Sequence, residues 1–241
     1  MAPHHRAEIE YRERGTGDKD LSDLLQRACH DLKTSLRAIE AHAQLLGRNR
    51  QPVDPPVMEQ HLEFIAGGAA RIGQITDGLV SYAIALQIEP AAFQLISMEV
   101  LLRTALAKHR GELREHGAEV TNGELPRVAG NPDRLTQIFE ILVLNSVRHH
   151  SGAARIHITA GKSGEHWLFA VRDDGPGIDR NHLETIFKPF KRWDSNGAKG
   201  VGMGLTICRA IVERHGGEMW AESETGKGAV FFFTLPADRG A

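Results

Sequence analysis

The sequence predicts an α+β protein in which an antiparallel helical hairpin is followed by an α/β sandwich. Apolar residues recur in alternating steps of four and three over residues 21–46 and 58–86, which is the heptad pattern of packed helices. After Pro90 the pattern changes to short alternating strands between helices, which indicates one mixed sheet with helices on one face. We place an N-terminal arm or linker at 1–19, the helical domain at 20–89 and the second domain at 90–241.

Composition excludes several functional classes. The formal net charge is only −2, so nucleic acid is not an expected partner. The chain has no apolar run near the roughly 18 residues of a membrane span, and its charged N-terminus does not resemble a secretory signal. Cys29 and Cys208 lack metal-type spacing, so we expect a reducing, cytoplasmic setting and packed thiols rather than a redox role.

The first 89 residues predict two long helices. Gly15 to Gly17 indicate a break after a loose arm, so the first helix is expected from about Asp20 to Arg48. The proline-rich segment 48–56 predicts the loop of a hairpin. One hairpin cannot cover two seams of this length, so we expect two copies to form a four-helix bundle. A monomeric three-layer arrangement is the alternative.

The second domain shows alternating strand and helix patterns. Asn131 and Pro132 are typical of a helix start, and the glycines between 160 and 167 suit a hairpin. We expect strands at 93–97, 118–122, 155–160, 167–172, 217–222 and 229–235, and helices at 100–116, 131–149, 181–187 and 204–215.

One stretch of the first helix combines several reactive side chains. His30 lies opposite the apolar seam, Asp31 is its neighbour, and Thr34 shares its helix face at i+4. A helical histidine is most often a solvated surface residue. A functional interpretation of His30 therefore depends on a second region, far along the chain, that has the features of a nucleotide site.

Three segments of the second domain have chemistry suited to a nucleotide. Asn145 and Arg148 share a helix face and suit magnesium and phosphates, although an ordinary polar helix end is the alternative. Asp173 ends a strand before Gly-x-Gly, where it can accept a hydrogen bond from an exocyclic amine, or else form a plain turn. Segment 200–205 is glycine-rich and leads into a helix, which favours anions.

The neighbouring loops could complete such a site. Segment 188–200 is polar and basic and could close as a lid over a ligand, or be a surface loop; its cations are Lys188, Lys191, Arg192 and Lys199. Segment 225–228 is a tight hairpin whose glycines leave room near a ribose or base.

Taken together, these segments resemble the bacterial sensor histidine kinases, including those attached to phytochrome-like and PAS sensors, over about residues 20–236. HDLKTSL resembles the phospho-acceptor box, LVLNSVR the N box, DDGPGI the G1 box, IFKPFKRW the F box and GVGMGLTIC the G2 box. The resemblance implies a dimeric helical domain and an ATP-binding domain with the Bergerat fold.

The resemblance also implies roles for single residues. His30 would be the phospho-acceptor, Asp31 the acid that orients or deprotonates it, and Thr34 a residue used in dephosphorylating a partner. Asn145 would bind Mg²⁺, and Asp173 the adenine amine of ATP. The other implied nucleotide-binding residues are Arg148, Gly175, Gly177, Lys188, Gly200, Gly202, Gly204 and Leu205. The implied partners are a second copy, a response regulator receiver domain and an upstream sensor.

Three positions depart from the family pattern. Ile141 stands where an amide is usual, Asp174 where Asn is usual, and Ser35 where Pro is common. Ile141 cannot activate water, which argues against an ATPase of the gyrase type, and Glu140 lies about 100° around the helix from that face. Two hypotheses follow. The chain is either an active histidine autokinase that supplies a response regulator, or a weak or inactive homologue that acts as a docking, phosphotransfer or phosphatase scaffold.

Overall fold

The computed structural model describes residues 3–48, 54–191 and 200–237. The chain divides into two compact units, residues 1–77 and 78–241, and each is considered by itself. The division falls inside the second helix, because Gly78 already packs against Met203, whose Cγ lies 3.0 Å from the place of a Cβ on that glycine.

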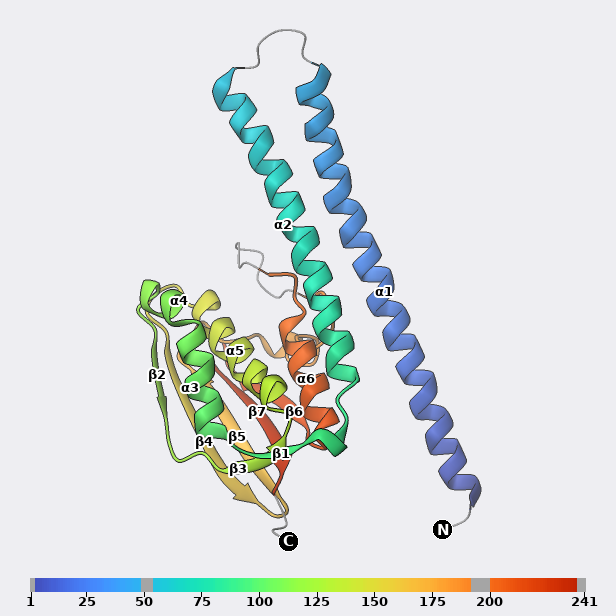
Figure 1. Cartoon of the computed structure of the whole chain (residues 1–241), viewed down its shortest axis with the longest axis vertical. Coiled ribbons are helices and arrows are strands. Elements are labelled where there is room, and N and C mark those ends of the chain that lie inside the picture. Colours follow the sequence, from blue (N-terminus) through green and yellow to red (C-terminus); the bar gives the residue numbers. More distant parts are fainter. Residues whose placement is uncertain (1–2, 49–53, 192–199, 238–241) are drawn as a thin grey trace. The chain divides into compact units, whose positions relative to one another are not determined.

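The first unit is a helical hairpin of α1 (Pro3–Arg48) and the start of α2 (Pro55–Leu86), as Figure 1 shows. The expected break at Gly15 to Gly17 is wrong, because α1 is continuous through these residues. A helical glycine costs only about 1 kcal/mol, and the glutamate, arginine and lysine residues around this pair favour a helix. Pro55 is the first residue of α2, where the missing N–H of proline is harmless.

The two helices of the hairpin approach each other closely. Leu24, Ala28 and Ser35 of α1 and Ile75 of α2 are buried. A Cβ on Gly68 would lie 2.7 Å from Ile39 Cγ1, so this glycine lets the helix backbones meet. The buried seam of α1 differs from the predicted one near its start, since Leu24 is buried where Leu25 was expected. The apolar stripe is wider than one seam, so the helix-facing side chains are only part of it.

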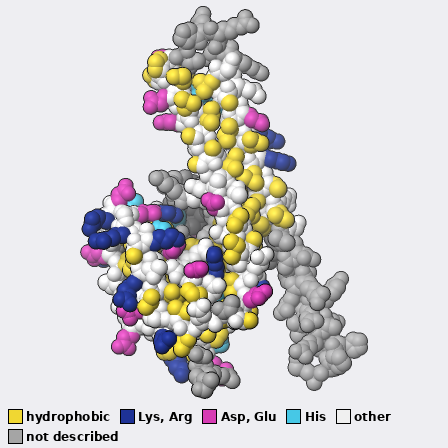
Figure 2. Space-filling view, in the orientation of Figure 1, with side chains coloured by type: hydrophobic (Ala, Val, Ile, Leu, Met, Phe, Trp, Pro, Cys, Tyr) yellow, Lys and Arg dark blue, Asp and Glu magenta, His cyan; other side chains and the backbone are white. Residues whose placement is uncertain are grey.

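The rest of that stripe is exposed. Figure 2 shows hydrophobic side chains along the hairpin surface. Seven large apolar residues of this unit are 42–52% exposed: Leu25, Leu36, Leu45, Val57, Met58, Leu62 and Phe64. Many exposed apolar side chains gathered on one pair of helices are typical of an interaction surface.

The second unit is an α/β sandwich. Its five-stranded sheet has the order β2-β4-β5-β7-β6, in which only the β2–β4 pair is parallel. The strands are β2 (Glu119–Asn122), β4 (Arg155–Ser163), β5 (His166–Asp173), β6 (Met219–Ser223) and β7 (Ala229–Pro236). The helices are α3 (Met98–Lys108), α4 (Arg110–Glu115), α5 (Pro132–His149) and α6 (Gly204–Arg214). Figure 1 shows α3, α5 and α6 over one face of the sheet.

Two details differ from the sequence-based expectations. A separate two-stranded sheet joins β1 (Gln94–Ser97) to β3 (Arg127–Gly130), where one sheet was expected. The four-residue β3 shows no alternating pattern that would identify it. The expected helix at 181–187 is a short 3₁₀ turn, Arg180–His182, followed by turns. The Asp179 carboxylate accepts from the Asn181 N–H and caps this turn.

The core lies between the sheet and the helices. Phe139 of α5 meets Phe233 of β7 edge-on, and Phe233 stacks on Phe169 of β5 at 4.7 Å between ring centroids. His215, at the C-terminal end of α6, is also buried. Its Nδ1 donates to the Ile211 carbonyl at 2.7 Å, so Nε2 accepts the Asn131 N–H at 3.0 Å. This neutral ring therefore ties the end of α6 to the start of α5.

Candidate functional site

The first part of the site is the His30 face of α1. The His30 side chain is 77% exposed, and its Nδ1 lies 3.1 Å from Asp31 Oδ1. A carboxylate can only accept, so Nδ1 carries the proton and the neutral ring has its lone pair on Nε2. The unprotonated nitrogen of His30 is therefore the one that does not face Asp31, which is the arrangement that a nucleophilic imidazole requires.

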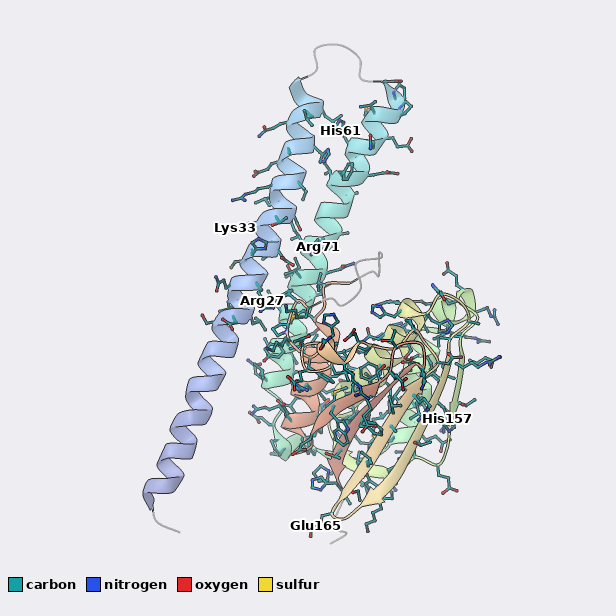
Figure 3. All side chains as sticks on the ribbon, turned by 180° about the vertical axis from the view of Figure 1, so that it is seen from behind. Arg27, Lys33, His61, Arg71, His157 and Glu165 are labelled. Carbon is teal, nitrogen blue, oxygen red and sulfur yellow. The ribbon has the colours of Figure 1, made fainter. Side chains whose placement is uncertain are left out.

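Asp31 is itself held from the second helix. Arg71 of α2 donates from Nη2 to Asp31 Oδ2 at 3.2 Å, and Figure 3 shows Arg71 on α2. The two oxygens of one carboxylate thus face His30 and Arg71. The sequence analysis missed Arg71, because nothing in the α2 pattern distinguishes it from a solvated helical arginine.

Thr34 lies on the same face of α1 as His30, as predicted. Its hydroxyl donates to the His30 carbonyl at 2.9 Å, and the Ser35 hydroxyl donates to the Asp31 carbonyl at 3.0 Å. Ser35 is buried, so its hydroxyl is satisfied inside the helix. Helix α1 continues through the position where a proline is common.

The second part of the site is centred on Asp173, at the end of β5. Its carboxylate is buried and lies within hydrogen-bond distance of three donors. Oδ1 accepts the N–H groups of Gly175 at 3.0 Å and Ala229 at 3.1 Å, and the Ser146 hydroxyl lies 3.2 Å from Oδ2 and 3.1 Å from the Leu142 carbonyl. The carboxylate is fixed in one orientation by α5, the following turn and β7. Ser146 and Ala229 are contacts of Asp173 that the sequence analysis did not single out.

The glycines after Asp173 have a packing role. Gly177 has φ +72°, and a Cβ there would collide with the backbone carbonyl of Glu224 in the β6–β7 hairpin. Gly228, with φ +78°, lies in the same way against the Asp173 carbonyl. The Ile178 N–H donates to Ser223 Oγ at 2.7 Å. The turn and the hairpin thus form one close-packed unit at the edge of the site.

Asn145 lies near the start of α6. A Cβ on Gly204 would be 4.0 Å from both Asn145 Oδ1 and Nδ2, and 2.9 Å from Ile141 Cγ2. The N-cap Met203 makes no side-chain cap, so the first N–H groups of α6 rely on other acceptors. An amide oxygen beside a helix N-terminus suits a magnesium ion that is bound to phosphate oxygens.

Within the described residues, no group of three or more His, Cys, Asp or Glu side chains could hold a metal ion. Ile141 also faces Gly204, so an apolar side chain occupies the place beside Asn145. Glu140 points elsewhere, because its carboxylate oxygens both lie 2.9 Å from Lys108 Nζ.

The structure also describes three other residues of the predicted nucleotide site, namely Arg148, Lys188 and Gly200. The Arg148 guanidinium is bound to Glu112 of α4, with Nε 2.9 Å from Oε1, and this bond lowers the pKa of the Glu112 carboxyl. Arg148 is thus committed to an ion pair. Lys188 is exposed, and Gly200 has φ +141°. The predicted cations Arg192 and Lys199 lie outside the described residues.

Two contacts fix the approach to α6. The Phe190 N–H donates to the Gly202 carbonyl at 3.0 Å, and a Cβ on Gly202, whose φ is +75°, would meet the Lys191 backbone. The Thr206 hydroxyl, next to Leu205, donates to the Phe187 carbonyl at 2.9 Å. The G2-like segment and the end of the F-box-like segment are therefore held together.

Comparison with known proteins places this geometry in a family. Residues 130–239 match the model of the histidine kinase-, DNA gyrase B- and HSP90-like ATPases. Cyanobacterial phytochrome A of Nostoc sp. is 36% identical over 219 residues, which are 90% of this chain and 28% of the relative. The chain belongs to the sensor histidine kinases. The sensor histidine kinase ZraS of Escherichia coli K12 is 29% identical over 90% of this chain and 46% of its own.

Solved histidine kinases share the fold. The catalytic domain of ThkA is 28% identical, with a TM-score of 0.53, over 60% of this chain and 95% of that one. ThkA in complex with the response regulator protein TrrA has a TM-score of 0.70 at 22% identity, over 98% of this chain and 67% of that one. The chain spans less than a third of the length of the phytochrome relatives. In the described part of this kinase, no helix has the length and apolar character needed to cross a bilayer.

Proposed function

We propose that this chain phosphorylates itself on His30 from ATP and passes the phosphoryl group to an aspartate of a response regulator receiver domain. The observation that carries the proposal is the exposed imidazole whose Nδ1 is held by Asp31, because this arrangement leaves Nε2 free to attack. Membership of the ATPase family supplies the phosphoryl donor.

The first step is an in-line displacement. The Nε2 lone pair of His30 forms a bond to the γ-phosphorus of ATP, the bond from that phosphorus to the bridging oxygen breaks, and ADP leaves. The ring becomes cationic as Nε2 bonds, and Asp31 stabilises that charge or takes the Nδ1 proton. In the second step, a carboxylate oxygen of a receiver aspartate bonds to the phosphorus, the bond from phosphorus to His30 Nε2 breaks, and the imidazole leaves in its starting form. Both steps depend mainly on positioning and charge neutralisation.

The nucleotide would be bound by the second unit. Asp173 would accept the exocyclic amine of adenine, since its carboxylate is already fixed by three donors. Asn145 would hold Mg²⁺, which neutralises charge on the phosphates. The N–H groups at the start of α6 would face the phosphates. Thr34 would take part if the chain also dephosphorylates its partner.

The exposed apolar stripe of the hairpin supports a homodimer. Its seven side chains on α1 and α2 would be covered in a four-helix bundle formed with a second copy. A response regulator partner is supported by the ThkA complex, in which a related kinase binds one. An upstream sensor, in this polypeptide or in another, would complete the signalling pathway.

Ile141 favours a second candidate function, that of a weak kinase acting as a docking and phosphotransfer scaffold. Its side chain lies beside Asn145 and Gly204, where an amide would add a polar ligand. The Ile141→Asn variant separates the two functions. A large gain in autophosphorylation favours the scaffold, and an unchanged rate removes its support.

The direct test is incubation with γ-labelled ATP and Mg²⁺. We expect acid-labile, base-stable label on the wild type and none on His30→Ala. His157→Ala, an exposed histidine of β4 labelled in Figure 3, is the matched control and should label normally. Nucleotide binding without any label would overturn the kinase proposal and leave the scaffold.

A further inference from the structure

We infer that His150 is a positioning residue of the nucleotide site, and that it acts through Asp174. This inference rests on the proposed function, because it concerns the affinity of the same site for ATP. Its basis is a contact between two residues that follow α5 and β5. Asp174 Oδ1 lies 3.4 Å from His150 Nε2 and accepts the Arg155 N–H at 2.8 Å.

The hydrogen bonds of His150 define its tautomer. His150 is the C-cap of α5, and its Nδ1 accepts the Gly152 N–H at 2.9 Å. A ring nitrogen that accepts carries no proton, so the proton of the neutral ring lies on Nε2, the nitrogen that is 3.4 Å from Asp174 Oδ1. The Gly152 N–H fixes the ring, and its side chain is only 17% exposed.

The imidazole also lies against the turn that carries Asp173. A Cβ on Gly175 would lie 3.9 Å from His150 Cδ2 and 3.0 Å from Asp173 Oδ1. The β6–β7 hairpin holds the other side of this turn, where Gly228 packs against the Asp173 carbonyl. His150 and Asp174 therefore complete the support of Asp173 and Gly175.

Charge gives the pair a second consequence. Asp174 places a second carboxylate directly after Asp173, at the edge of a site for a nucleotide that is itself negatively charged. The Arg155 N–H holds this carboxylate at the start of β4, and the Nε2–H dipole of His150, 3.4 Å away, stabilises its charge. His150 thus offsets the cost of an acid at position 174, and loss of His150 leaves the Asp174 charge with one partner instead of two.

The test is a double-mutant cycle on ATP affinity, measured by calorimetry with Mg²⁺ on the full chain. We expect His150→Ala to weaken ATP binding roughly 3- to 10-fold. In the Asp174→Asn background, where the charge is absent, the same change should alter affinity less than about twofold. His150→Gln, which retains a side-chain N–H donor, should recover most of the affinity. His157→Ala is the control.

Other results would overturn the role. An equal loss with Asp or Asn at position 174 would mean that His150 acts only on folding, and circular dichroism on each variant would show that loss of structure. Unchanged ATP binding by His150→Ala, while the wild type binds, overturns this inference alone. A wild type that binds no nucleotide overturns the proposed function as well. Side-chain ¹⁵N spectra must also show the Nε2–H tautomer for His150.

Discussion

Arg71 of α2 and Asp31 of α1 form an ion pair across the helical hairpin, with Nη2 and Oδ2 3.2 Å apart. The other oxygen of Asp31 faces His30 Nδ1, so the arginine acts on the histidine through a shared carboxylate. The orientation of the His30 imidazole thus depends on both helices of the hairpin.

We expect Arg71→Ala to slow autophosphorylation about two- to fivefold, because a partly exposed ion pair contributes at most about 1 kcal/mol. Arg71→Lys should retain part of the rate, since it keeps the charge and loses the planar fork. Single-turnover labelling at saturating ATP is the measurement. The exposed Arg37→Ala is the control, and an unchanged rate in Arg71→Ala would contradict the role.

Ser146→Ala removes the hydroxyl donor of the buried Asp173 carboxylate. We expect the unfolding free energy to fall by about 1 kcal/mol, because Asp173 keeps two N–H donors, and ATP affinity to fall with it. Urea unfolding and calorimetry measure the two effects. Ser163→Ala, at an exposed position of β4, should change neither. A loss of stability without a loss of affinity would separate the Ser146–Asp173 contact from nucleotide binding.

The stability of the second unit should depend on pH through His215. Burial lowers the pKa of His215 in the folded state below its ordinary value of 6.5. The unfolded state therefore binds the proton first, so the stabilisation is complete above about pH 6.5 and is lost as the pH falls below it.

Urea titrations between pH 5 and 7.5 would measure this dependence. His215→Gln should flatten the slope while lowering stability at pH 7, because the buried hydrogen bonds to Ile211 and Asn131 are disturbed. His157→Ala should retain the wild-type slope. An unchanged slope in His215→Gln would assign the effect to another group.

Two glycines with similar backbone angles should respond differently to alanine. Gly177 and Gly164 have φ of +72° and +60°, but only at Gly177 would a Cβ meet the Glu224 backbone. We expect Gly164→Ala to cost about 1 kcal/mol, from backbone strain alone. Gly177→Ala should cost about 3 kcal/mol or more, because the hairpin must also move. Equal losses in thermal or urea unfolding would contradict the close-packing interpretation.

Local features of this kinase could be predicted from its sequence, and contacts between distant segments could not. The predicted start of α5 is confirmed, since Asn131 Oδ1 accepts the Arg134 N–H at 3.1 Å. It could be predicted because a helix cap involves neighbouring residues only. The predicted β4–β5 pairing is also confirmed, and it too joins segments that are neighbours in the sequence. The β1–β3 sheet, whose strands are about 30 residues apart, was missed.

The candidate site follows the same division. The positions of His30, Asp31 and Thr34 on one helix face follow from helical geometry alone. The Arg71–Asp31 contact joins residues 40 positions apart, and the Ser146–Asp173 contact joins residues 27 positions apart. No repeating pattern in the sequence links residues at such distances, so neither contact could be predicted. The sequence analysis gave Gly177 only a nucleotide-binding role, and the structure adds that its lack of a side chain makes room for the Glu224 backbone of the β6–β7 hairpin.

The contacts of Gly202 have a consequence for sequence evolution. Because Gly202 touches Phe190 and Lys191, the chain leaves and re-enters the fold at nearly the same place on either side of residues 192–199. When the two ends of a loop are already fixed together, doubling its length costs only about 0.6 kcal/mol. A change of length between Lys191 and Gly200 should therefore add little loop-closure entropy, and Asp173, Asn145 and α6 can keep their positions while this segment lengthens.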